Sequence, residues 1–270
     1  QNLIGDAIND IWLGTFHSIC VKILRKFIDR LGYDSSFAIF DTADQKTLVK
    51  KCLKELDIDS KIFTEKSVIN EISNAKNMMI KPDDYILRNK GDYRKEKIGK
   101  IYSLYQKKLK ENNAVDFDDI INLTIDLLLE NEDILEYYSD KFKYILVDEY
   151  QDTNKSQFKL VSILAKKNMN IMVVGDNDQG IYSFRGADIS NILNFEKDFA
   201  GTKIVKLEQN YRCTGNILKV ANEVIKNNTT KYDKKLWTEN DEGELPFIYT
   251  GKDEYDEASF ITTKIEEIKN

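Results

Sequence analysis

Two short apolar runs, each ending in acidic residues, constrain the fold of this chain more than any other feature. The first run, YILV at 144–147, leads into Asp148 and Glu149, and the second, NIMVVG at 170–175, leads into Asp176. A stretch with helical periodicity, residues 155–166, separates the two runs. Short apolar runs of this kind are typical of strands that are buried on both faces of a parallel sheet. The pattern therefore predicts a strand, a helix and a second strand in succession.

A third apolar run, KIVKL at 203–207, follows a predicted helix at 189–199 and extends the same alternation. Alternating strands and helices indicate an α/β fold with mainly parallel strands. Beyond this run, we expect Thr214 to cap a helix that reaches Ile225, and residues 258–268 to form a last helix.

The N-terminal half of the sequence has helical periodicity instead. Apolar residues at helical spacing run from Phe16 to Leu31, and Gly32 is placed to end that helix. Thr42 and Gln45 have the form of a capping box at the start of another helix. Further helical patterns occupy 68–75, 98–109, 117–129 and 134–138, so that 42–138 is predicted to be all-helical. The acidic string DFDD at 116–119 is interpreted as a helix N-cap and not as catalytic.

Composition and charge restrict the class of protein. No apolar run approaches the roughly 18 residues that span a bilayer, and the three cysteines show neither paired nor metal-ligand spacing. We therefore expect a cytoplasmic protein. Although the net charge is -6, residues 88–111 hold nine basic against three acidic residues, and residues 238–270 hold ten acidic against three basic ones. The basic stretch fits either a solvated helix face or a contact with nucleic acid.

Carboxylates follow both predicted strands at the point where each strand ends. In a parallel sheet these ends lie at one rim, where ligands bind. Several like charges at a partly desolvated rim are costly unless a cation lies among them, and Mg²⁺ prefers oxygen ligands. We expect Asp148 to hold the hydration shell of Mg²⁺ and Glu149 to orient or deprotonate a water that attacks a phosphate. The alternative is that this acidic pair caps the following helix.

Five strings carry a resemblance to a known family: GTFHSICVKILR at 14–25, NAVDFDDII at 113–121, DEYQDTN at 148–154, GDNDQGIYSFRGA at 175–187 and LEQNYRCTGNI at 207–217. The chain resembles the UvrD/PcrA/Rep-type superfamily 1 DNA helicases over nearly its whole length, and looks most like their PcrA branch. The resemblance implies an incomplete RecA-like P-loop NTPase parallel sheet with an inserted all-helical subdomain. It implies a first core from 1–40 and 116–206, an insertion at 41–115, and the start of a second core at 207–270.

The resemblance also implies roles on the nucleotide side, with ATP and Mg²⁺ as the bound groups. Asp148 would bind the metal and Glu149 would activate water. Gln151 and Asp152 would couple the nucleotide state to movement, and Gln179 would sense the γ-phosphate. In QNYR, Tyr211 would stack near the adenine and Arg212 would act as an arginine finger.

On the DNA side, the resemblance implicates Thr15, Phe16 and His17 of GTFHS, and Tyr182, Phe184 and Arg185 of the longer string. The family often has Trp where this chain has Phe184, so an aromatic platform is kept with less stacking area. Two rings two residues apart would lie on the same side of an extended segment. The alternatives are that Phe16 belongs to the core and that His17 is a structural residue. The basic stretch falls in the implied insertion, which favours DNA contact there.

No G-x-x-x-x-G-K-[ST] string occurs in the 270 residues. We therefore expect an internal fragment of an ATP-dependent DNA helicase, inactive alone, whose parent translocates on single-stranded DNA and unwinds duplex DNA. Its partners would be single-stranded and duplex DNA, with no membrane. Sheet edges and apolar surface left exposed would favour association. Two alternatives are an ATPase-inactive nucleic-acid-binding scaffold and an AddA/RecB-like helicase-nuclease subunit.

Overall fold

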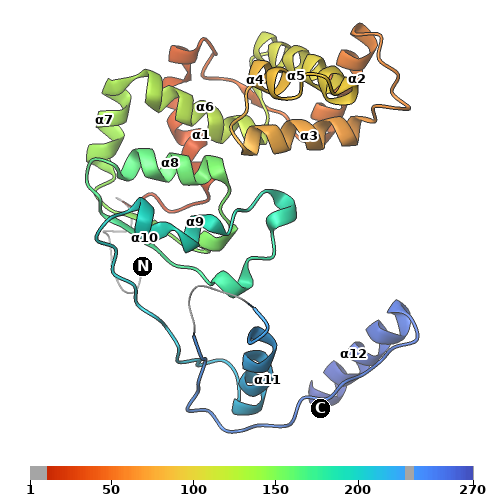
Figure 1. The fold of residues 1–270 in the computed structure, drawn as a ribbon, viewed down its shortest axis with the longest axis vertical. Coiled ribbons are helices and arrows are strands. Elements are labelled where there is room, and N and C mark those ends of the chain that lie inside the picture. Colours follow the sequence, from red (N-terminus) through yellow and green to blue (C-terminus); the bar gives the residue numbers. More distant parts are fainter. Residues whose placement is uncertain (1–10, 229–233, 270) are drawn as a thin grey trace. The chain divides into compact units, whose positions relative to one another are not determined.

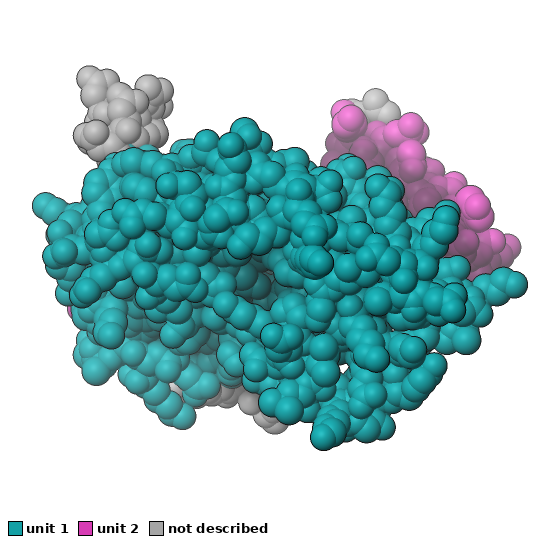
Figure 2. Space-filling view, turned by 90° about the horizontal axis from the view of Figure 1, so that it is seen from above, with its two compact units in different colours: residues 1–202 teal, residues 203–270 magenta. Residues whose placement is uncertain are grey.

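The computed structural model describes residues 11–228 and 234–269 of the chain, without the side chain of Arg185. It divides into two compact units, residues 1–202 and 203–270, which are distinguished by colour in Figure 2. The described elements are mostly helices, and two small parallel sheets lie in the first unit. No helix within the described ranges is both long and apolar enough to cross a membrane.

The predicted strand, helix and strand are confirmed. Strands β3 (Ile145–Val147) and β4 (Ile171–Val173) pair in parallel, with Ile145 opposite Ile171. Helix α8 (Lys155–Ala165) connects them. It begins at Asn154, whose side-chain oxygen accepts a hydrogen bond from the Gln157 amide at 2.9 Å. The two strand ends therefore meet at one rim, as expected of parallel strands.

The prediction that these strands are buried on both faces is wrong. Leu146 and Met172 are 72% and 57% exposed, whereas Val147 is buried in a core with Tyr150 and Phe195. Successive side chains of a strand point to opposite faces. Only one face of this pair is therefore covered by the part of the chain that the structure describes.

The prediction of a strand at 203–207 is also wrong. Val205 and Leu207 are largely exposed, and the segment has no ladder hydrogen bonds to a described strand. An apolar run becomes a strand only where a neighbour supplies those bonds, which the sequence of the run does not reveal.

The other predicted helices of this region are present with altered ends. The helix predicted at 189–199 is two short helices, α9 (Ser190–Leu193) and α10 (Phe195–Asp198). Helix α11 (Gly215–Ile225) follows Thr214, whose hydroxyl makes no capping bond. Helix α12 (Glu254–Lys269) extends the predicted last helix by four residues at its start.

Helix α1 (Phe16–Phe27) confirms the first predicted helix, and its last turn tightens into the 3-10 helix η2 (Ile28–Leu31). Gly32 ends it with φ 75°, a left-handed conformation that favours glycine. Helices α6 (Phe117–Glu130), α7 (Glu132–Lys141) and α8 pack with α1 around the main core of the first unit.

Four helices surround a second core: α2 (Thr42–Glu55), α3 (Glu65–Asn77), α4 (Pro82–Arg88) and α5 (Tyr93–Glu111). Buried Val49, Ile72 and Tyr105 lie in this core. We call these helices the helical subdomain. Figure 1 shows them grouped together, and α3 joins this group to α6 and to the start of α8. The predicted all-helical stretch of 42–138 is interrupted by β2 (Ala114–Val115), which pairs with β1 (Ala38–Ile39).

The predicted capping box is misplaced by one residue. Asp41, not Thr42, is the N-cap of α2, because its carboxylate accepts from the amides of Ala43 and Asp44 at 2.7 and 2.9 Å. The Asp44 side chain in turn accepts from the Asp41 amide, so the reciprocal box is made by two aspartates.

Candidate functional site

Glu149, the second residue after β3, has a strained backbone conformation. Its φ of 49° and ψ of 44° lie in the left-handed region, which costs a residue other than glycine on the order of 1 kcal/mol. The Asp148 carboxylate accepts from the Glu149 amide at 2.9 Å. Both side chains are exposed. The sharp turn therefore presents two carboxylates at the carboxyl end of β3.

Gln151 links the ends of the two strands. Its side chain is buried, its Nε2 donates to Glu149 Oε2 at 2.8 Å, and its Oε1 accepts from the Asp176 amide at 3.0 Å. Gly175 allows this close approach, because a Cβ at that position would lie 2.5 Å from Gln151 Oε1 and 3.1 Å from the Tyr150 nitrogen. The side-chain amide of Gln151 therefore holds both Glu149, which lies after β3, and the backbone that follows β4.

The end of β4 continues the same network. Asp176 accepts from the Asp178 amide and from Gln179 Nε2, each at 2.9 Å. Gln179 closes the short helix η4 (Asn177–Gln179) and its side chain is exposed. The structure therefore brings Glu149, Gln151, Asp176 and Gln179 into one continuous chain of hydrogen bonds, which we call the rim network.

The alternative interpretation of the acidic pair, as a cap for the next helix, is met in position only. Glu149 occupies the N-cap position of η3 (Tyr150–Asp152) but makes no side-chain capping bond there, and the cap of α8 is Asn154. Burial and the charge of Glu149 raise the pKa of Asp152. One carboxylate oxygen of Asp152, Oδ1, is buried without a hydrogen-bond partner among the described residues. The rim is thus an acidic environment that a cation would stabilise.

The donors at the rim fit Mg²⁺ better than a softer metal. They are carboxylate and amide oxygens, and Mg²⁺ commonly takes one or two carboxylates together with phosphate oxygens and water. No cluster of three or more His, Cys, Asp or Glu side chains that could hold a metal occurs in the described ranges. The exposed carboxylate of Asp148 is the ligand that this arrangement offers.

The candidate DNA aromatics do not lie on an extended segment, contrary to the prediction. Residues Ser183–Arg185 form the 3-10 helix η5, which Gly186 ends with φ 88°. The rings of Tyr182 and Phe184 nevertheless lie together, with centroids 6.1 Å apart, and Phe184 is 75% exposed. The backbone of Arg185 belongs to η5, and its side chain lies outside the described part.

The GTFHS candidates have structural contacts of their own. Thr15 is the N-cap of α1 and accepts from the Ser18 amide at 3.3 Å. Phe16 is partly buried and packs against both the main core and the core beside β3. His17 meets the ring of Phe117 edge to face at 5.6 Å, and burial lowers its pKa. These contacts agree with the structural alternatives for Phe16 and His17 and leave the exposed Thr15 accessible.

Tyr211 and Arg212 belong to the second unit. Tyr211 is 79% exposed, and its hydroxyl donates to Gln209 Oε1 at 2.8 Å. The Asn210 side chain accepts from the amides of Arg212 and Cys213 at 2.9 and 2.7 Å. This turn presents the tyrosine and arginine side chains to solvent.

The comparisons with known proteins agree with the division into two units. A family model described as the UvrD/REP helicase N-terminal domain matches residues 1–200, and one described as the UvrD-like helicase C-terminal domain matches residues 205–270. The chain belongs to the UvrD/REP helicase family. The resemblance found in the sequence is thereby confirmed.

Curated members of the UvrD/REP helicase family match almost the entire chain. The chain is 48% identical to the ATP-dependent DNA helicase PcrA of Bacillus subtilis over 268 residues, which are 99% of the chain. It is 50% identical to the protein of the same name from Staphylococcus aureus over 265 residues, or 98% of the chain. In both comparisons the chain spans 36% of the length of the relative.

The basic stretch at 88–111 runs from the last residue of α4 through the connection at 89–92 and along the whole of α5. Several of its cations have partners within the protein. Lys108 pairs with Glu55 at 2.7 Å, and Arg94 donates to the Ser67 hydroxyl at 2.8 Å. Contact between this stretch and DNA stays a prediction.

Sequence reasoning missed a buried ion cluster. Lys76 is 2% exposed and its Nζ lies 2.6 Å from Asp116 and 2.7 Å from Asp119. Although burial disfavours its charge, the two aspartates raise the pKa of Lys76. The signal was available, because Lys76 falls at helical spacing within the apolar stripe of Val68 and Ile72.

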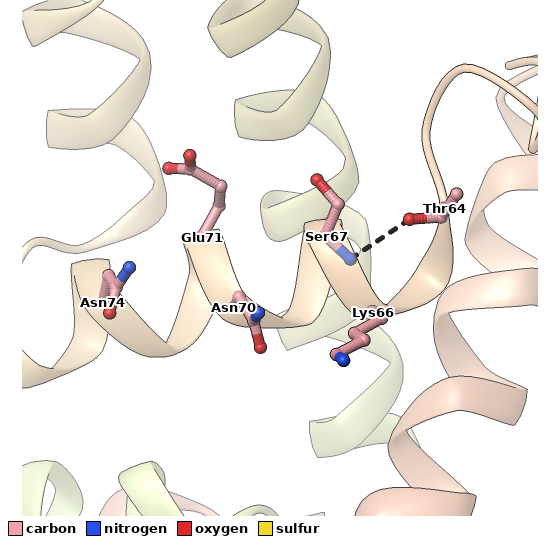
Figure 3. A pocket seen from close by; sticks show the side chains of 6 residues that line it. All are labelled: Thr64, Lys66, Ser67, Asn70, Glu71 and Asn74. Carbon is pink, nitrogen blue, oxygen red and sulfur yellow. Dashed lines mark hydrogen bonds between the residues drawn. The ribbon is translucent and has the colours of Figure 1, made fainter. Parts of the chain in front are cut away.

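Helix α3 also borders a hollow on the helical subdomain (Figure 3). It is lined by Thr64, Lys66, Ser67, Asn70, Glu71 and Asn74. The Ser67 amide donates to the Thr64 hydroxyl at 3.3 Å, which caps the helix. None of the candidate site residues lines this hollow.

Proposed function

We propose that this chain is part of an ATP-dependent DNA helicase that couples ATP hydrolysis to translocation on single-stranded DNA and to unwinding of duplex DNA. The relatives named above are ATP-dependent DNA helicases. The observation that carries the proposal is the rim network, in which Gln151 fixes Glu149 beside the backbone that leads to Gln179. Such preorganisation suits a group that must act on a bound phosphate.

On the nucleotide side, the carboxylate of Glu149 orients the attacking water and accepts its proton. Gln151 fixes that carboxylate through its Nε2. Gln179, which is bonded to Asp176, would respond to the γ-phosphate. Asp148 would hold Mg²⁺, which neutralises charge on the phosphates when it is bound. In the second unit, Tyr211 stacks against the adenine. Arg212 stabilises the transition state, a contribution of about 10³ to 10⁵ in rate for an arginine finger.

On the DNA side, the rings of Tyr182 and Phe184 provide stacking surfaces, each worth about 1 to 3 kcal/mol per base. Arg185, Thr15 and His17 are proposed to contact the strand, and Phe16 to support the surface from the core. Stacking of this type does not depend on base identity, as a translocating enzyme requires.

We propose a RecA-like P-loop arrangement for the complete protein, in the cytoplasm. Residues 1–40 and 116–206 would form the first core, 41–115 the insertion, and 207–270 the start of the second core. The helical subdomain, with a buried core of its own, supports this assignment of the insertion.

The test is steady-state ATP hydrolysis by the full-length protein, with and without single-stranded DNA, for the natural protein and its Glu149→Gln variant. We expect DNA to stimulate hydrolysis, and the variant to lose about 10²-fold to 10⁴-fold in rate because it lacks a general base. Binding of a fluorescent ATP analogue should persist in the variant, because the glutamine keeps the size of the side chain.

Asp133→Asn, at an exposed carboxylate paired with Arg30, is the control for loss of one surface charge. If the natural protein hydrolyses no ATP under any of these conditions but binds DNA, the motor is excluded and the nucleic-acid-binding scaffold is favoured.

A further inference from the structure

The C-terminal end of α3 is fixed to the start of α6 by buried polar contacts. Besides the ion pairs of Lys76, Tyr105 donates its hydroxyl to Asp116 at 2.9 Å, and Asn122 donates to the Lys76 carbonyl at 2.9 Å. Three helices, α3, α5 and α6, thus meet at a single buried cluster. The next residue along the chain, Asn77, is therefore held in a defined place.

Asn77 contacts the start of α8, the helix that follows the turn at 149–154. Its Oδ1 accepts from Asn154 Nδ2 at 2.6 Å. The other end of the Asn154 amide, Oδ1, accepts from the Gln157 amide and the Ser156 hydroxyl, each at 2.9 Å, and so caps α8. Asn154 thus uses its oxygen for the cap and its nitrogen for the helical subdomain.

The segment held by Asn154 belongs to the rim. Only Thr153 separates Asn154 from η3, which contains Gln151 of the rim network. The Thr153 carbonyl accepts from the Asp188 amide at 2.9 Å and from Asn191 Nδ2 at 3.0 Å. A displacement of Asn154 would therefore be transmitted to both Gln151 and the backbone around 188–191.

Asn77 also lies near the loop at 182–186, which carries Tyr182 and Phe184 and which we call the aromatic loop. A Cβ placed on Gly186 would lie 3.6 Å from the Cβ of Asn77. Gly186 ends η5 directly after Phe184 and Arg185. One side chain of the helical subdomain thus bonds the start of α8 and lies beside the end of the loop at 182–186.

We propose that Asn77 is a positioning residue, which holds the catalytic turn at 149–154 and the aromatic loop at 182–186 in one mutual placement. This inference rests on the proposed function, because the two segments are taken to serve ATP hydrolysis and DNA binding. Asn77 is not itself one of the residues proposed to bind nucleotide or DNA. It acts on those residues through Asn154 and Gly186. Loss of the Asn77 to Asn154 bond should weaken the stimulation of hydrolysis by DNA more than hydrolysis without DNA.

Two aspartate substitutions separate this bond from the helix cap. Asn77→Asp keeps the acceptor that Asn154 needs. Asn154→Asp keeps the cap of α8, and Asn77 can turn its amide to donate to the new carboxylate. The double substitution places two carboxylates against each other, which breaks the bond while the cap remains. Asn74→Asp, one turn earlier on the exposed face shown in Figure 3, is the control on α3.

ATP hydrolysis by the full-length protein is the first readout. We expect each single variant and Asn74→Asp to stay close to the natural protein. In the double variant, we expect the DNA-stimulated kcat to fall about tenfold beyond the product of the single effects, a typical coupling for side chains in contact. The rate without DNA should fall by a smaller factor than the DNA-stimulated rate, because it does not depend on the placement of the aromatic loop. An effect equal to the product of the singles would overturn the proposal.

Hydrogen exchange of the same variants gives a readout that does not depend on activity. We expect faster exchange at 149–154 and 182–188 in the double variant alone, and unchanged exchange there would overturn the proposal. If the natural protein shows no DNA-stimulated hydrolysis, the proposed function fails. The exchange result then still decides whether Asn77 fixes the two segments.

Discussion

At the scale of single residues, the orientation of the Gln151 amide decides what the rim can do. Its nitrogen donates to Glu149 and its oxygen accepts from the Asp176 amide, so the two ends of the side chain cannot be exchanged. A glutamate would accept at both ends and repel Glu149, and an alanine would leave a buried amide unpaired. The rim therefore depends on an amide at this position and not merely on a polar residue.

Glu149 permits a direct measurement of the backbone strain at the rim. Because its φ is 49°, a glycine fits this conformation and an alanine does not. We expect Glu149→Gly to be more stable than Glu149→Ala by about 1 kcal/mol, since both remove the side chain and only one keeps the strain. Urea unfolding of the two variants measures the difference. Equal stabilities would show that the turn relaxes when the carboxylate is absent.

At the scale of elements, the cluster of Lys76, Asp116 and Asp119 joins the helical subdomain to α6. Burial opposes the charge of Asp116, but Lys76 lowers the pKa of Asp116. Burial and the charge of Asp116 raise the pKa of Asp119 to about 7. The ordinary pKa of an aspartate is 3.8, so between pH 3.8 and about 7 the folded chain binds more protons at Asp119 than the unfolded chain does. The stability that Asp119 contributes is complete below 3.8 and is lost as the pH rises through about 7.

Removing the cation of this cluster should destabilise the chain in a pH-dependent way. We expect Lys76→Met to cost about 3 to 5 kcal/mol at pH 8, because it leaves buried carboxylates unpaired. The loss should be smaller at pH 5, where those carboxyl groups can bind protons. Urea unfolding of the natural chain and the variant at both pH values tests this.

Lys81→Met is the matched control, because Lys81 pairs with Asp126 at 2.9 Å at the surface. Such pairs contribute about 0 to 1 kcal/mol. A loss for Lys76→Met that is equal at pH 5 and pH 8 would exclude titration of the cluster.

The elements show what local sequence can and cannot specify. Periodicity predicted α1, α3, α5, α6 and α8, because each buries one stripe of a regular helix. It missed α4, which has only seven residues, too few for a periodic pattern. It also placed a strand at 203–207, where the decisive factor is a neighbouring strand and not the run itself.

The candidate site was predicted in the same partial way. The expectation that acids follow both strands at one rim needed only strand ends, and β3 and β4 confirm the pairing on which it depended. The left-handed turn at Glu149 and the bond from Gln151 to the Asp176 amide arise from tertiary contacts. A sequence pattern does not encode them. The roles assigned to the candidate residues stay predictions.

At the scale of the whole molecule, the two units differ in how much core they contain. The three apolar cores lie within the first unit. Among the described residues of the second unit, Leu218 is the one buried apolar side chain, while Val220, Val224 and Ile265 are exposed. The first unit therefore has the apolar burial that folding requires, and the second has little.

We expect residues 203–270 alone to show no cooperative thermal unfolding, because so little apolar area is buried there to oppose the loss of chain entropy. Residues 1–202 alone should keep a cooperative transition. Circular dichroism during heating of both segments tests this. A sigmoidal transition in the shorter segment would contradict it.

The left-handed turn at Glu149 has a further consequence for how this sequence can change under selection. The residue that best suits the backbone there is glycine, and the residue proposed for chemistry is glutamate. Laboratory evolution for heat resistance alone, without a demand for ATP hydrolysis, should therefore enrich glycine at position 149. Retention of glutamate in such a population would mean that the carboxylate contributes to folding more than the strained turn takes away.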